Sequence, residues 1–291
     1  MYLTFKYKKT NAMIKKLLFA GAIAILSIAS SDAQTLKTPV PSPATTVNQD
    51  FGLANIQLSY SRPGMKGRKI FGDVVPFGKV WRTGANTATT LTFGEEVTIG
   101  GTKIKAGKYG LLTIPETNEW TVIISKQTDV TSPAAYKQDQ DVVRVKVKPV
   151  DLPFNTETFT IGFGNITANT CDLQIWWENK RVDVAISADV ESRVMAQIKN
   201  TMEKDNRPYF NAAMYYLENG KDLNQALVWF DKAIESNPSA YWMQHQRANT
   251  LAKLGRKAEA LAAANKSLEL AKTAQNGDYV TLNEKLIASL K

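Results

Sequence analysis

The chain has 291 residues, a formal net charge of +9, a single cysteine and a single histidine. This length exceeds the usual span of one domain, so we expect two modules with separate cores. The lone cysteine excludes an internal disulfide. The lone histidine argues against a Cys/His zinc site or a Ser-His-Asp triad in the first module, unless His245 reaches it from the second. We therefore expect no metal and no cofactor.

The first 33 residues have the pattern of an export signal. Lys15 and Lys16 precede an apolar run, 17–28, and residues 31–33 form a small-x-small cleavage site. We expect cleavage after residue 33 and an exported protein, periplasmic or secreted. Met13 is an alternative start of this signal.

Removal of the signal changes the charge. It takes away five lysines and one aspartate, which lowers the formal charge from +9 to +5. Because this excess is mild, we expect no nucleic-acid partner, and acidic envelope components fit better. No later run approaches the roughly 18 apolar residues of a membrane-spanning helix, so no membrane span is expected.

Residues 34–46 contain three prolines and no periodic apolar face, which predicts an extended linker. From 47 to 187, short alternating runs are separated by Gly, Pro, Asn and Asp. This pattern is typical of an all-β sandwich, jelly-roll-like or barrel-like. Gly100 and Gly101 predict a two-residue hairpin turn. The predicted inward-facing residues are Ile56, Leu58, Tyr60, Trp120, Val122, Ile124, Val143, Val145, Val147, Phe159, Ile161, Phe163, Val182, Val184 and Ile186.

Residues 188–291 change to helical periodicity. A first helix is predicted over 189–202 with Asp189 as its cap. An offset of 34 residues then aligns Ala226 with Ala260 and Phe230 with Ala264. Residues 207–272 resemble tetratricopeptide repeats, which implies an all-α array of helical hairpins that contacts a protein or peptide. A capping helix is expected over 279–290.

One segment, 61–90, gathers basic, aromatic and amide side chains between turn-rich loops. Its blocks S-R-P-x-x-K-G-R-x-I-F-G and V-P-F-G-K-V-W-R-T-G-A-N-x-A-T are followed by A-G-x-Y-G-L-L-T-I-P and E-W-T-V-I-I-S-K. In this order they resemble an exported bacterial family called domain of unknown function 2911, over about 47–187. The resemblance implies a module without an established activity, so no site residue follows from it.

The side chains of this segment could bind an anionic or carbohydrate ligand, because arginine forks suit carboxylates and phosphates and an indole stacks on a sugar ring. The candidates are Arg62, Lys66, Arg68, Trp81, Arg82 and Asn86. The alternative is structural: the arginines pair with Asp73, Glu95 or Glu96, and the indole belongs to the core. A third interpretation is an enzyme that acts on an envelope carbohydrate or phosphate ester, with a carboxylate beside these arginines.

The helical module offers a second candidate surface on its inner helices. The residues expected to be exposed there and to contact a peptide are Asn211, Tyr215, Asn219, Gln244 and His245. Elsewhere, Cys171 alternates with apolar residues and should be a core residue. The neighbours Trp176 and Trp177 should face opposite sides, one in the core and one on a ligand platform or under the helical module. The leading interpretation is an exported, non-enzymatic two-module interaction protein.

Overall fold

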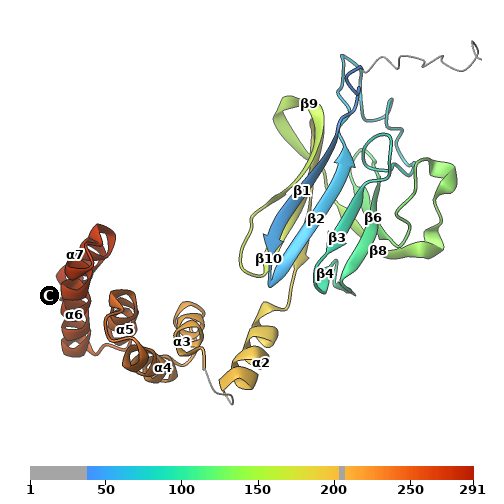
Figure 1. Ribbon diagram of the computed structural model, residues 1–291. Helices are drawn as coiled ribbons and strands as arrows, with labels where there is room; N and C mark the ends of the chain where they lie inside the picture. The colour runs from blue at the N-terminus through green and yellow to red at the C-terminus, as the bar shows by residue number, and fades with distance from the viewer. Residues whose placement is uncertain (1–37, 203–206) are drawn as a thin grey trace, which may run out of the picture. The chain divides into compact units, whose positions relative to one another are not determined.

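The computed structural model describes residues 38–202 and 207–291 of the chain (Figure 1). The predicted signal peptide, 1–33, lies outside these ranges, as do the first residues of the predicted linker. Within the described ranges, no helix is long and apolar enough to cross a membrane.

The first module is a sandwich of two antiparallel sheets. The larger sheet has the order β1 (Ala44–Phe51), β2 (Ala54–Ser61), β3 (Thr90–Phe93), β6 (Gly107–Ile114), β7 (Trp120–Ser125) and β8 (Asp141–Val147). The smaller sheet has the order β5 (Thr102–Ile104), β4 (Val97–Ile99), β10 (Thr170–Ser187) and β9 (Val150–Gly164). The predicted all-β sandwich is therefore confirmed, and Figure 1 shows β9 and β10 as its long hairpin.

The alternation of the strands builds the core between the sheets. Leu58 of β2, Phe159 of β9 and Leu173 of β10 are fully buried and belong to one cluster. Burial of such side chains stabilises the fold by about 1.5–3 kcal/mol each. Gly100 and Gly101 both have positive φ and join β4 to β5 as the predicted hairpin turn. Strand β1 begins at Ala44, slightly before the predicted start of the module.

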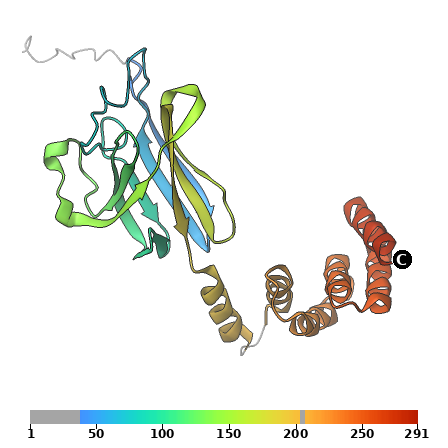
Figure 2. The ribbon, with the colours of Figure 1, turned by 180° about the vertical axis from the view of Figure 1, so that it is seen from behind.

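Strand β7 departs from the predicted alternation. Val122 and Ile124 face the core as expected, but Ile123, expected on the wet side, is also fully buried. It packs with Leu112 and Val130 in a second cluster outside the sandwich core. A covering segment, residues 126–140, lies over this side of the sheet and includes two short 3-10 helices. It appears in green at one side of the sandwich in Figure 2.

The second module consists of helices. They are α2 (Val190–Met202), α3 (Tyr209–Glu218), α4 (Leu223–Ser236), α5 (Tyr241–Lys253), α6 (Lys257–Thr273) and α7 (Gly277–Leu290). Asp189 caps α2 as predicted, because its Oδ1 accepts a hydrogen bond from the amide of Ser192 at 3.2 Å. Asp222 caps α4 in the same way, through the amides of Asn224 and Gln225.

The repeat predicted from the 34-residue offset is present in the packing. Ala226 and Phe230 of α4 are fully buried, and so are their counterparts Ala260 and Ala264 of α6. The small alanines let neighbouring helices approach closely, while Phe230 fills the first hairpin. Helix α7 closes the array, since Leu290 joins the cluster of the second hairpin. The predicted tetratricopeptide-like array is confirmed, and α7 follows its last repeat.

Candidate functional site

The three arginines of the predicted ligand cluster donate hydrogen bonds to their own module. Arg62 Nε reaches the carbonyl of Phe159 at 3.2 Å, and its Nη2 reaches Thr160 Oγ1 at 2.9 Å. Arg68 turns back to the carbonyls of its own loop, at 2.9 and 2.8 Å. Arg82 Nη1 donates to the carbonyl of Thr131 at 2.6 Å. The guanidinium groups therefore join separate backbone segments and do not converge on one ligand position.

The other members of that cluster also separate. Trp81 packs into the core, stacked on Trp177 with ring centroids 6.0 Å apart, and its Nε1 donates to the carbonyl of Gly84 at 3.0 Å. Lys66 is exposed in a turn, with its backbone at positive φ. Asn86 is exposed at φ 57 on the next loop. The alternative that places the Trp81 indole against the core fits this packing, because the ring stacks on Trp177 and its N–H is hydrogen-bonded inside the sandwich.

Two of the three carboxylates assigned to these arginines in the structural alternative, Glu95 and Glu96, have other partners, and Asp73 is exposed in its loop. Glu95 is buried, accepts the amide of Leu53 at 2.8 Å and pairs with Arg193 of α2. Glu96 pairs with Lys103 at 3.3 Å. The arginines are thus engaged structurally, as that alternative held, but with backbone carbonyls in place of acidic side chains.

A cleft of about 410 Å³ includes the end of the segment 61–90. It brings together parts of the chain that are far apart in sequence. Strands β1, β2, β3 and β6 contribute one part of it. Residues 87–88 and the covering segment contribute the rest. The residues that line it are Ala44, Thr45, Thr46, Ser59, Tyr60, Thr87, Ala88, Thr90, Lys108, Thr128, Asp129 and Thr131. We call this feature the hydroxyl cleft.

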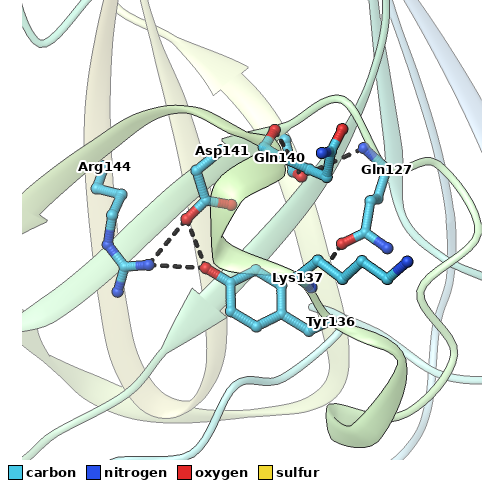
Figure 3. Close-up of polar contacts among 7 residues, drawn as sticks. Gln127, Tyr136, Lys137, Gln140, Asp141 and Arg144 are labelled. Carbon is cyan, nitrogen blue, oxygen red and sulfur yellow. Dashed lines mark hydrogen bonds and ion pairs between the residues drawn. The ribbon is translucent and has the colours of Figure 1, made fainter.

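The covering segment is fastened at its far end by three side chains (Figure 3). Asp141 Oδ2 accepts hydrogen bonds from the hydroxyl of Tyr136 at 2.5 Å and from Arg144 Nη1 at 2.8 Å. Arg144 Nη1 also donates to the Tyr136 oxygen at 2.7 Å. Burial and the Asp141 carboxylate raise the pKa of Tyr136 to about 12, so the phenol keeps its proton at neutral pH.

Gln127 connects the near end of the covering segment to the later part of the same segment. Its side chain donates to the carbonyl of Ala135 at 3.0 Å. Its Oε1 accepts a hydrogen bond from the amide of Lys137 at 2.7 Å (Figure 3). The backbone of Gln127 crosses Gly110 of β6 so closely that a Cβ on Gly110 would stand 2.0 Å from the Gln127 carbonyl oxygen. A glycine at this position therefore lets the covering segment pack close enough to β6 to form one wall of the hydroxyl cleft.

The W-R-T-G-A-N segment, residues 81–86, supports the side of the hydroxyl cleft that lies opposite the covering segment. Thr83 is fully buried at φ 55, and its hydroxyl lies 3.1 Å from Thr113 Oγ1. A β-branched residue at positive φ is a true outlier, and such strain is held in place only by surrounding contacts. Thr89 Oγ1 supplies one of these, donating to the Thr83 carbonyl at 2.7 Å. Through Arg82 and Thr131 the segment is also joined to the covering segment.

The predicted peptide-binding residues of the helical array divide into two groups. Asn211 is exposed, and Tyr215 and Gln244 are half-buried. Asn219 is exposed at the end of α3, where its amide donates to the carbonyl of Tyr215 at 2.9 Å. His245 is 7% exposed, which corrects the expectation that it is exposed on the inner surface.

His245 instead belongs to a buried polar network between helices. Its Nδ1 lies 2.8 Å from Asn283 Oδ1 of α7, and Asn283 Nδ2 donates to Ser267 Oγ of α6 at 2.8 Å. Ser267 in turn donates to the carbonyl of Tyr241 at 2.7 Å. These bonds satisfy three buried polar side chains and attach the capping helix to the second hairpin.

Among the remaining predictions, Cys171 is a buried core residue, and burial raises the pKa of its thiol to about 11. Trp177 lies in the core and Trp176 is half-buried on the opposite face of β10. In the parts of the chain that the structure describes, no group of His, Cys, Asp and Glu side chains is arranged to hold a metal ion.

Together these features define a class of protein: an antiparallel β-sandwich followed by an array of helical hairpins. Residues 42–186 match a family described as protein of unknown function (DUF2911). Residues 207–239 and 243–273 match the tetratricopeptide repeat. The chain therefore carries a DUF2911 domain followed by tetratricopeptide repeats, in the order that the sequence predicted. No curated protein and no solved structure shows significant similarity to it.

Proposed function

We propose that this chain is an interaction protein whose helical repeats bind a protein partner through α3 and α5. The observation that carries the proposal is a small cleft, of about 190 Å³, formed by side chains of α3, α4 and α5 and of the residues just before α3. Its lining combines aromatic, apolar and polar groups: Arg207, Pro208, Tyr209, Phe210, Asn211, Ala233, Ser236 and Met243. Grooves of this composition suit an apolar anchor of a peptide with polar groups at its rim.

Site-specific photocrosslinking tests this proposal in the full chain. A photoreactive amino acid replaces Asn211 on α3 or Gln244 on α5. The control carries it at Asn265 on α6, which is exposed as Asn211 is. We expect one adduct of the same mass from both Asn211 and Gln244 and none from Asn265. Equal adducts at all three positions, or none at the first two, would contradict partner binding by this surface.

We also propose that the protein is exported to the periplasm or secreted. The support is the basic, apolar and small-residue order of residues 15–33. If the signal is cleaved as expected, N-terminal sequencing of the protein from producing cells finds Gln34 as the first residue. An intact N-terminus would contradict export by this signal.

An anion-binding or enzymatic function built on the arginine cluster has less support. Arg62, Arg68 and Arg82 each donate to oxygen atoms of their own module, and these bonds hold the three guanidinium groups on separate backbone segments. Trp81 is likewise engaged in the core. Ligand binding by the β-sandwich is better supported at the hydroxyl cleft.

A further inference from the structure

The hydroxyl cleft has the construction of a binding site whose walls are held in place. Its volume of about 410 Å³ falls within the usual range for small-molecule sites. One wall belongs to the covering segment, which the Tyr136–Asp141 hydrogen bond fastens to β8 and which Gln127 connects internally. The other follows the segment that holds the strained Thr83. Backbone strain of this kind persists only where surrounding contacts maintain it, and it clusters at functional sites.

Most residues of the lining carry a hydroxyl group, although the hydroxyl of Tyr60 lies in the core, hydrogen-bonded to Ile161. Thr46 Oγ1 and Ser59 Oγ lie 3.0 Å apart and form a hydrogen bond to each other. Two other hydroxyls of the lining, on the exposed residues Thr87 and Thr128, have no hydrogen-bond partner among the described residues and are available to a ligand. Each hydroxyl can donate one hydrogen bond and accept others, and each threonine adds a methyl group to the surface. Ala44 and Ala88 extend the apolar part of the lining.

The charges of the cleft cancel. Lys108 and Asp129 are its two charged side chains, both are exposed, and neither forms an ion pair within the described residues. A site for phosphate or carboxylate would present an excess of positive charge or an arginine fork. This lining offers no such excess, so its electrostatics favour a ligand without net charge.

We propose that the hydroxyl cleft binds a neutral sugar, either a monosaccharide or a terminal residue of a glycan. A sugar ring presents hydroxyl groups that both donate and accept hydrogen bonds, which matches side chains of threonine, serine, lysine and aspartate. Its C–H groups match the methyl groups of Thr46, Ala44 and Ala88. The site is separate from the helical array, and the proposal does not depend on partner binding there.

The test is titration of the full chain with a panel of neutral mono- and disaccharides, with binding measured by ligand-observed NMR. Asp129→Ala removes the acceptor carboxylate, and Thr128→Trp fills the cleft from the covering segment. Both residues are exposed, so both variants should keep the wild-type melting temperature. We expect at least one saccharide to bind and each variant to weaken that binding by about tenfold or more. Gln57→Ala is the matched control, since Gln57 is exposed on β2 two residues from Ser59 but outside the cleft.

Several results would overturn the proposal. One is the absence of saccharide binding by the wild-type chain at millimolar concentration. Another is tighter binding of inorganic phosphate or acetate than of any sugar, which would indicate a charged ligand. A third is loss of binding in Trp176→Ala while Asp129→Ala and Thr128→Trp still bind, because the sugar would then stack on the half-buried indole of β10.

Discussion

Gly110 shows how one missing side chain shapes the candidate site. The carbonyl of Gln127 occupies the volume that a Cβ at Gly110 would need. Gly110 itself pairs with Thr90 of β3 and Ser125 of β7, so it cannot move away without disturbing both neighbouring strands. The close approach of the covering segment therefore depends on this glycine.

Gly110→Ala should accordingly destabilise the sandwich. The added methyl group forces the backbone of Gln127 outward, and overpacking of this kind costs about 1–3 kcal/mol. The measurement is the free energy of unfolding in denaturant, together with protease sensitivity of residues 126–140. Gly277→Ala is the control, because a Cβ at Gly277 meets no atom within 4 Å. An unchanged stability of Gly110→Ala would mean that the covering segment adjusts without cost.

At the scale of elements, an ion pair between a buried carboxylate and a partly exposed arginine connects helix α2 to the sandwich. Glu95 follows β3, and 5% of its side chain is exposed, while Arg193 approaches it from α2. The backbone of Gly52 and Leu53 forms the other side of this site, where the amide of Leu53 donates to Glu95 Oε1. Val190 adds an apolar contact with the core. The first helix, α2, is therefore attached to the β-module, although the helical periodicity of its sequence marks it as the start of the helical module.

Arg193→Ala tests that attachment. It leaves the Glu95 carboxylate buried without its cation, which costs about 1–3 kcal/mol. We expect a lower midpoint of unfolding for the sandwich and faster amide hydrogen exchange in α2. Lys103→Ala is the comparison, because it breaks the exposed pair with Glu96 and should change stability by less than about 1 kcal/mol. Equal effects of the two variants would argue against a structural role for the Glu95 pair.

At the scale of the whole molecule, the helical array is short and depends on its end. Two matched repeats are fewer than the three that such arrays usually need for independent stability. Helix α7 supplies the missing neighbour: Leu290 packs with Leu227 and Leu251, and Asn283 satisfies His245 and Ser267. The capping helix thus replaces a further repeat.

Truncation after residue 275 should therefore destabilise the array. It exposes the apolar surface covered by Leu286, Ile287 and Leu290 and leaves His245 without Asn283. Because each buried apolar side chain contributes about 1.5–3 kcal/mol, the free energy of unfolding should fall by several kcal/mol. We expect the melting temperature of the helices, measured by far-UV circular dichroism, to fall by at least about 10 °C. Leu282→Ala, on the exposed side of α7, should leave it nearly unchanged. A truncated chain that melts like the wild type would show that the repeats are stable without the cap.

The sequence alone determined the class and order of the modules, because hydrophobic period is a local property. Alternation in runs such as 56–60 and 182–186 predicted the strands that face the core, and the 34-residue offset predicted buried positions in α4 and α6. The family of each part also followed from local blocks of residues. Turn chemistry at Gly100 and Gly101 and the cap at Asp189 were equally local.

Only the tertiary structure decided which side chains meet. The partners of Arg62 and Arg82 are carbonyls about 97 and 49 residues away, and a carbonyl carries no sign of its role in the sequence. Ile123 and His245 are buried by segments that fold over them, 126–140 and α7, which no local period reveals. The hydroxyl cleft escaped sequence analysis for the same reason: its threonines are unremarkable one by one and form a surface only when distant strands and loops come together.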